Sequence, residues 1–185
     1  SIGDFSPQEA TQLMEALTAE GIEPQITVDD GIRRVDVRHG SAGLKAKIEI
    51  FVSAVPTHTT EEMQHNLKAI GWWSLTRTKI EESKADLWVF VIPSFFHPER
   101  QFILMPPKEL LDILNRVHGS DAAKIQSYFS VTTKNRCWES RGLNKDDEES
   151  MAMHRYENQA RDCTKYLNNW NALTDRMKEK AEPAH

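Results

Sequence analysis

Alternating apolar and polar residues predict two neighbouring β-strands early in the chain. Over Arg33–Arg38, Val35 and Val37 share one face of the expected strand, while charged residues share the other. The same alternation runs through Lys45–Ala54, and the glycine-containing segment 39–43 between the strands is typical of a turn. We therefore expect the two strands to pair as a hairpin with one apolar face and one polar face.

Four further segments are predicted to be strands. Leu87–Ile92 is apolar at every position, which is typical of a central strand that is covered on both faces. The other three are Gln25–Val28, Trp72–Thr76 and Gln101–Met105. The segment 128–145 fits a strand followed by a loop, without a clear period.

Helical spacing of apolar residues predicts the helices. The first begins at Ser6-Pro7 and ends near Gly21, and the next two are Thr59–Ile70 and Pro107–His118. A long helical stretch begins in the acidic run Asp146–Glu149 and reaches Trp170, after which the last fifteen residues are expected to fray.

These elements together predict an α/β fold, with a mixed central β-sheet flanked by helices on both faces. We expect one α/β domain over residues 1–145 and a C-terminal helical extension over residues 146–185 that packs on it.

The composition is that of a globular protein in water, with 39% hydrophobic residues, 28% charged residues and a mean hydropathy of −0.58. The longest apolar run has six residues, whereas a bilayer-spanning helix needs roughly 20. No signal-peptide pattern is present, and Cys137 and Cys163 form neither a disulfide framework nor a zinc motif. We therefore expect an intracellular, cytoplasmic protein that does not enter a membrane.

Charge is distributed unevenly along the chain, although the net charge is −5. The first 30 residues hold seven acids and no Lys or Arg, while residues 31–145 hold 17 basic and 12 acidic side chains. The middle of the chain could therefore present a local surface that binds phosphate, although an ordinary solvated surface explains the same distribution.

Two acids on the expected hairpin are the strongest candidates for chemistry. Asp36 and Glu49 lie on the polar faces of adjacent strands, so pairing of the strands would bring the carboxylates close together. Mg²⁺ binds through one or two carboxylates and completes its octahedron with water and substrate phosphate. Such a metal could activate water for phosphodiester hydrolysis.

The pattern Val35-Asp36-Val37, a turn, and Ile48-Glu49-Ile50-Phe51 resembles the core hairpin of PD-(D/E)XK nucleases, the restriction-endonuclease-like superfamily. The order of later segments over roughly residues 7–171 is also similar to small bacterial members. The resemblance implies a restriction-endonuclease-like core and a DNA endonuclease that uses Mg²⁺ or Mn²⁺. It makes Asp36 and Glu49 the metal-binding and catalytic acids, and it makes Glu15 on the first helix a further metal ligand.

The chain departs from the family pattern at the lysine that should lie two residues after the second acid. Phe51 occupies that position. Lys47 lies two residues before Glu49 on the same strand face, and its flexible stem could serve as a stand-in catalytic lysine. Alternatively the site is degenerate, and the charges on the hairpin only form salt bridges, Asp36 with Arg34 or Arg38 and Glu49 with Lys47.

Three functions follow from these observations. The first is a Mg²⁺-dependent nuclease, and the second is a catalytically degenerate module of the same fold that binds nucleic acid or a protein. The third is a structural subunit that uses its C-terminal helix, over residues 146–180, to form a homodimer or to dock. If DNA is the partner, the residues expected to contact it are Arg34, Arg38, Lys45, Lys134 and Arg136. Weaker candidates are His58, His65, His97 and Trp72-Trp73.

Overall fold

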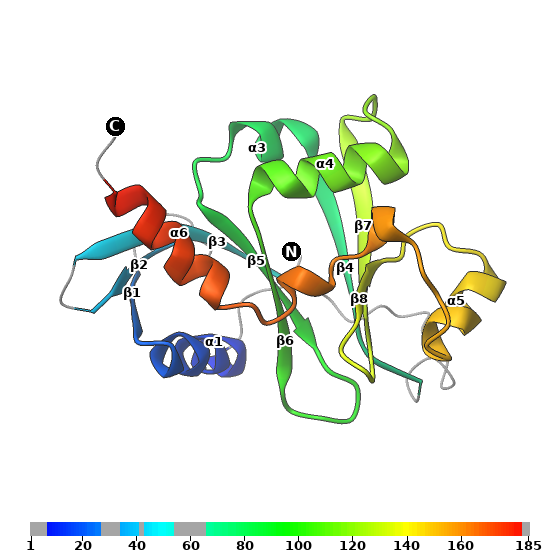
Figure 1. Ribbon diagram of the computed structural model, residues 1–185, viewed down its shortest axis with the longest axis horizontal. Coiled ribbons are helices and arrows are strands. Elements are labelled where there is room, and N and C mark those ends of the chain that lie inside the picture. The colour runs from blue at the N-terminus through cyan, green and yellow to red at the C-terminus, as the bar shows by residue number, and fades with distance from the viewer. Residues whose placement is uncertain (1–6, 27–33, 41–42, 54–65, 183–185) are drawn as a thin grey trace.

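A computed structural model describes residues 7–26, 34–40, 43–53 and 66–182, and these residues form a mixed α/β fold built around two sheets (Figure 1). The larger sheet has five strands in the order β1-β2-β3-β5-β6. Only the β3–β5 pair is parallel among these neighbours. The strands are β1 (Ile22–Ile26), β2 (Arg34–His39), β3 (Leu44–Val52), β5 (Leu87–Pro93) and β6 (Arg100–Met105).

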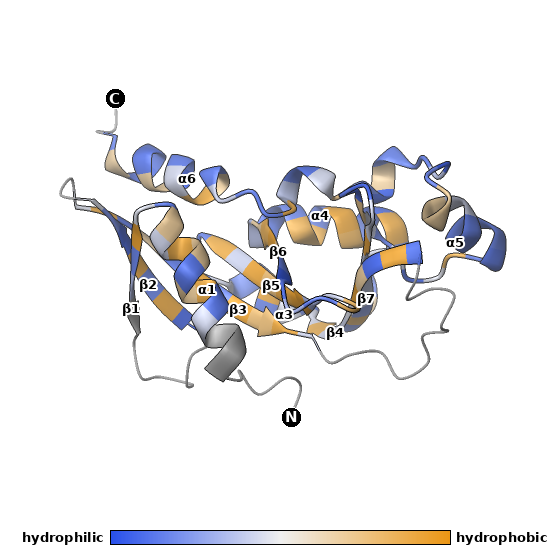
Figure 2. Ribbon diagram, turned by 90° about the horizontal axis from the view of Figure 1, so that it is seen from below, coloured by the Kyte–Doolittle hydropathy of each residue, from blue (hydrophilic) through white to orange (hydrophobic). Residues whose placement is uncertain are grey.

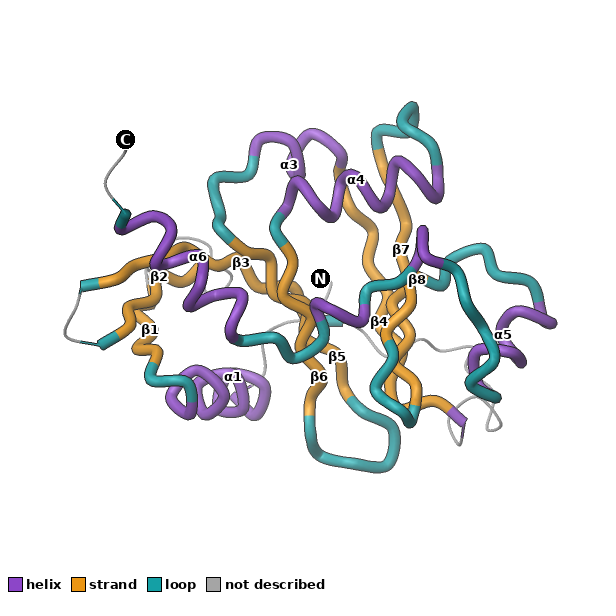
Figure 3. The backbone as a smooth tube through the Cα atoms, viewed as in Figure 1, coloured by secondary structure: helices purple, strands orange, loops and turns teal. Residues whose placement is uncertain are grey.

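The smaller sheet has three antiparallel strands in the order β4-β7-β8. It consists of β4 (Leu67–Thr76), β7 (Lys124–Thr132) and β8 (Cys137–Glu139). The helices around both sheets are α1 (Pro7–Ala19), α3 (Arg77–Glu82), α4 (Pro107–His118), α5 (Lys145–Ala152) and α6 (Asn171–Ala181) (Figure 3). The predicted fold class is therefore confirmed. No described helix combines the length and the apolar character needed to cross a bilayer.

Strand β5 is buried on both faces, as its sequence predicted, and each face belongs to a different hydrophobic cluster. Val89 and Val91 pack with residues of α1 and α6, including Leu17 and Leu173, on one side of the sheet. Phe90 on the other side packs against the β4–β7–β8 sheet and α4. Figure 2 shows α6 lying along the side of β2 and β3 that the first cluster occupies.

The hairpin β2–β3, the strand β6 and the helix α4 agree with the sequence-based predictions to within one or two residues. The predicted helix over Thr59–Ile70 is correct at Asn66, which is helical, and wrong from Leu67 onward, where β4 begins; residues 59–65 lie outside the described part of the chain. A register shift between Leu67 and Ala69 breaks the twofold period of this strand, so its apolar residues mimic helical spacing.

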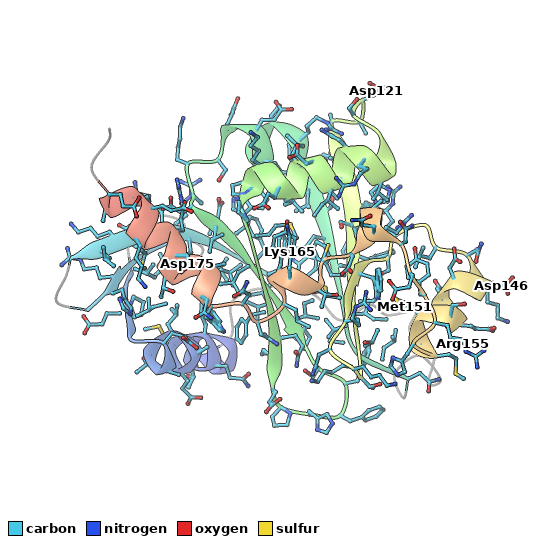
Figure 4. All side chains as sticks on the ribbon, in the orientation of Figure 1. Asp121, Asp146, Met151, Arg155, Lys165 and Asp175 are labelled. Carbon is cyan, nitrogen blue, oxygen red and sulfur yellow. The ribbon has the colours of Figure 1, made fainter. Side chains whose placement is uncertain are left out.

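The predicted long helix from Asp146 to Trp170 begins correctly but is wrong in its length. Helix α5 ends at Ala152, and His154 then adopts a positive φ of 62°, which a helix cannot continue through. Met151 lies on α5 in Figure 4, whereas Lys165 lies beyond it, in the segment that leads to α6. Helix α6 lies within the last fifteen residues, which were expected to fray. It is ordered instead, since Leu173 is buried against the larger sheet.

Asp86 connects α6 to the strands β3 and β5. Its side chain is only 6% exposed and accepts hydrogen bonds from Arg176 Nε at 3.1 Å, Lys180 Nζ at 2.8 Å and the backbone amide of Lys47 at 2.8 Å. Burial, the largest single influence, raises the pKa of Asp86, but the hydrogen bonds and charges of Lys180, Lys47 and Arg176 together outweigh it and hold the pKa below its usual value.

A second buried carboxylate joins α4 to β7 and β8. Glu139 is fully buried; its Oε2 atom lies 2.9 Å from His118 Nε2 and accepts a hydrogen bond of 2.8 Å from Ser127 Oγ. Its Oε1 atom accepts a hydrogen bond of 2.9 Å from Arg161, which also donates to the carbonyls of Glu139 and Arg141. The partners satisfy both carboxylate oxygens, as a buried charge requires.

We predict that Asp86→Asn lowers the free energy of unfolding by about 1–3 kcal/mol at neutral pH, because the hydrogen bonds to a charged acceptor are weakened. A lowered pKa means that ionised Asp86 stabilises the folded state above the usual aspartate range. This contribution is lost as the pH falls through the folded-state pKa. Denaturant unfolding between neutral and acidic pH should therefore show a flatter acid limb in Asp86→Asn. The control is Asp175→Asn, which changes an exposed aspartate of α6, and identical pH profiles for the two variants would contradict the assignment.

We predict that Glu139→Gln lowers the free energy of unfolding by about 3–5 kcal/mol, because the Arg161 guanidinium, whose side chain is only 14% exposed, loses its counter-charge. Glu157→Gln, which removes a 73% exposed partner of Arg136, should cost no more than about 1 kcal/mol. Chemical denaturation of both variants measures the difference, and similar losses of stability would show that the buried cluster has no special role.

Candidate functional site

The β2–β3 hairpin places the two candidate acids on the same face, as predicted. Asp36 lies directly opposite Lys47, and Glu49 lies directly opposite Arg34. Asp36 and Glu49 are therefore diagonal neighbours on adjacent strands. The backbones of such a pair are about 7–8 Å apart. The Glu49 Oε1 atom lies 3.9 Å from Arg34 Nε, so this carboxylate has a basic neighbour on the adjacent strand.

Lys47, the predicted stand-in lysine, shares this face with both acids. Its backbone is fixed, because its amide donates to Asp86 Oδ2 and its carbonyl accepts from the Asp86 amide, each at 2.8 Å. The Lys47 side chain is exposed, and Lys47 lies directly opposite Asp36 in the hairpin. The pattern thus correctly placed Asp36, Lys47 and Glu49 together, although the cross-strand pairs differ from the salt bridges that the sequence suggested.

Phe51, at the position where the family pattern has lysine, contributes to the core between the sheets. Its ring centroid lies 4.4 Å from that of Trp88 and 5.4 Å from that of Phe90. Trp73 and Phe129 extend the same cluster. The face of β3 that carries Glu49 therefore becomes apolar at the next residue on that face, Phe51. In the family pattern this position carries the ammonium group of a lysine.

Glu15 does not join the other two acids. Helix α1 packs through Leu13 and Leu17 on the face of the sheet that carries Ile48 and Ile50, which is opposite to the face of Asp36 and Glu49. Within the described residues, no group of three or more His, Cys, Asp or Glu side chains is arranged to hold a metal ion. The expected three-acid ligand set is therefore not assembled there.

The basic side chains expected to contact DNA lie in two places. Arg34, Arg38 and Lys45 are exposed on the hairpin face, where Arg38 lies directly opposite Lys45 in β3 and opposite Glu23 in β1. A pair of like charges on directly opposite residues destabilises a sheet, which makes the Arg38–Lys45 pair unusual.

Lys134 and Arg136 instead lie beside the smaller sheet, in and after the turn between β7 and β8. Arg136 is held by ion pairs with Glu157 at 3.1 Å and Asp162 at 3.0 Å. Its guanidinium carbon also lies 4.6 Å from the centroid of the Trp138 ring. These contacts give Arg136 a role in holding the segment after α5 against β8.

None of the weaker candidates in the described part of the chain joins the hairpin face. Trp73 is buried in the core, Trp72 is half-buried and His97 is exposed, while His58 and His65 lie outside the described residues.

The two cysteines are buried. Burial raises the pKa of Cys163 to about 12 and that of Cys137 well above its usual value, so both thiols stay protonated at neutral pH.

Two features of the structure were missed by the sequence analysis. The first is Asp86, directly before the apolar strand β5, whose buried side chain lies beside two basic residues of α6 and has three hydrogen-bond partners. The second is Phe96, which lies on the surface of the connection between β5 and β6 with 66% of the residue exposed, whereas the sequence analysis singled out only His97 there. The adjacent aromatic residues Phe95 and Phe96 between two strands were the available signal.

No family model, no curated protein and no solved structure matches this chain. The likeness to restriction-endonuclease-like proteins thus rests on the hairpin pattern and the order of elements described above, and the assignment to that superfamily stays a prediction.

Proposed function

We propose that this protein is a nucleic-acid-binding module that contacts phosphates through the polar face of β2 and β3 and does not hydrolyse them. The observation that carries the proposal is the pairing of Arg38 with Lys45 across the hairpin. Glu23, which lies opposite Arg38 in β1, supplies one negative charge against two positive ones, and a bound phosphate would relieve the repulsion that remains between the cations. Arg34 and Lys47 extend the basic surface along the same face.

The surroundings of the two acids argue for binding without catalysis. Each acid lies opposite a basic residue, Asp36 opposite Lys47 and Glu49 opposite Arg34. Phe51 places an aromatic ring where a lysine would orient the attacking water. Because position 51 carries no lysine and each acid faces a basic residue, we infer that the acids serve mainly to balance the charge of the hairpin.

A second candidate is the Mg²⁺- or Mn²⁺-dependent DNA endonuclease. It is favoured by one observation, the presence of Asp36, Lys47 and Glu49 on one face of adjacent strands. In this function the two acids would hold the metal ion, which would activate water for attack on phosphorus. Lys47 would then stabilise the developing charge from the side opposite to the family position.

The binding proposal predicts that the double variant Arg38→Glu/Lys45→Glu weakens duplex DNA binding about tenfold or more at moderate salt, because two phosphate contacts become repulsive. The dependence of log affinity on log salt concentration should become shallower by about 2 in slope. Fluorescence anisotropy of a labelled duplex over a salt series measures both quantities.

The matched control is Lys79→Glu/Lys178→Glu, which makes the same change in net charge on exposed residues of α3 and α6. This control should bind nearly as the wild type does. Equal weakening by both double variants would mean that binding follows net charge alone, and absence of wild-type binding at low salt would refute the proposal.

Plasmid nicking separates the two functions. We predict that the wild type leaves supercoiled plasmid intact with Mg²⁺ or Mn²⁺, and that Asp36→Asn/Glu49→Gln binds duplex DNA more tightly, because two negative charges leave the phosphate-facing surface. Metal-dependent nicking that this double variant abolishes would instead establish the endonuclease.

A further inference from the structure

The two cysteines of the chain lie opposite each other, although they are far apart in the sequence. Trp138 of β8 pairs with Asp162 in an isolated antiparallel bridge to the segment that follows α5. This register places Cys137 directly opposite Cys163, and the amide of Cys163 donates to the carbonyl of Cys137 at 2.8 Å. Figure 1 shows this segment running beside the smaller sheet on its way to α6.

This pairing has the backbone geometry of a disulfide. Opposite residues that share such a hydrogen bond have Cα atoms about 5.5 Å apart, and their side chains project from the same face. Cysteines joined by a disulfide have Cα atoms roughly 4.4–6.8 Å apart, most often about 5.5–6 Å. No backbone movement is therefore needed to join Cys137 to Cys163.

The side chains of the pair share one environment. Both cysteines are fully buried and belong to the same hydrophobic cluster, which also contains Phe129 and Tyr166. Burial is the main cause of the raised pKa of Cys137, and the Cys163 thiol raises it further, as a close neighbour does. The chain contains two cysteines in all, so a bond between them is the single disulfide that one molecule can form within itself.

A solvent-filled cleft leads to the segment that carries Cys163. The cleft has a volume of about 850 Å³ and is lined by Asp162 and Thr164, the residues on either side of this cysteine. A small molecule can therefore approach the backbone of Cys163 from solvent. The thiol itself lies in the core, so it reacts only when the segment opens locally, and the closed state protects it.

We propose that Cys137 and Cys163 form a redox site in which a small-molecule disulfide, such as oxidised glutathione, converts the two thiols into a disulfide. The new bond locks the segment 153–168 to β8, and an excess of small-molecule thiol reverses the reaction. This inference does not depend on nucleic-acid binding, because the β2–β3 face belongs to the other sheet.

The reaction consists of two thiol–disulfide exchange steps. With the segment open, the Cys163 thiolate attacks one sulfur of oxidised glutathione, breaks its S–S bond and releases one glutathione thiolate. The Cys137 thiolate then attacks the Cys163 sulfur of this mixed disulfide and releases the second glutathione thiolate. The two cysteines lose two electrons, and their two protons end on the two molecules of reduced glutathione.

The test equilibrates the native protein in mixtures of reduced and oxidised glutathione, followed by acid quenching, alkylation under denaturing conditions and measurement of the intact mass. We expect the wild type to become a monomer that has lost two hydrogen atoms and takes up no alkylating agent. Digestion should then yield a Cys137–Cys163 cross-linked peptide. Cys137→Ala and Cys163→Ala, the matched controls, should each fail to form this species.

Hydrogen exchange of the segment 153–168 measures the lock on the wild type itself. The stabilisation that a disulfide typically provides corresponds to an open population about 30- to 900-fold smaller. Exchange in this segment should slow by such a factor in the oxidised protein relative to the reduced protein. Cys163→Ala, treated with the same two mixtures, should exchange at the same rate in both.

Several outcomes would overturn the inference. A wild type that stays reduced in the most oxidising mixture would do so, as would one that forms only glutathione adducts or disulfide-linked dimers. A disulfide that leaves exchange of the segment unchanged would refute the lock. Absence of duplex binding would refute the proposed function and leave this inference intact.

Discussion

Both faces of β5 are apolar, and the need to keep them from water organises the chain around this strand. Helices α1 and α6 cover one face, while the smaller sheet and α4 cover the other. Because burial of apolar surface is the main force that drives folding, elements far apart in the sequence are brought to this strand. Helix α6 is an example, since it returns to the larger sheet and is fixed there by Asp86.

This arrangement also determines where a functional surface can lie. The second sheet covers the larger sheet over β5 and β6, and the same face continues over β3 and β2 as a charged surface. The boundary between the two falls within β3, between Glu49 and Phe51. The candidate site thus lies between a buried aromatic cluster and the solvent. Ion pairs in such a place are stronger than in bulk water.

The sequence predicted the helices and strands in which one regular spacing of apolar residues determines both the secondary structure and the buried face. The alternation of Val35 and Val37, the unbroken apolar run of β5 and the helical stripe of α4 all belong to this class. The shared face of Asp36, Lys47 and Glu49 followed from the same period, because pairing of the strands fixes which side chains are neighbours.

The parts that could not be predicted depend on distant partners or on irregular backbone. Strand β4 has a register shift, and His154 leaves the helical region after α5, so neither obeys one period. The roles of Asp86 and Glu139 depend on Arg176, Lys180 and Arg161, which are far from them in the chain. The cross-strand partners of the acids required the register of the hairpin, and a pattern of residue types does not specify it.

The ring of Phe51 limits which side chains this position of β3 can accept. Its contact with Trp88 links the second residue after Glu49 to the cohesion of the two sheets. A lysine introduced at position 51 would place an ammonium group against an indole ring that is almost wholly buried. A positive charge could therefore enter this position only together with a loosening of the interior around Trp88.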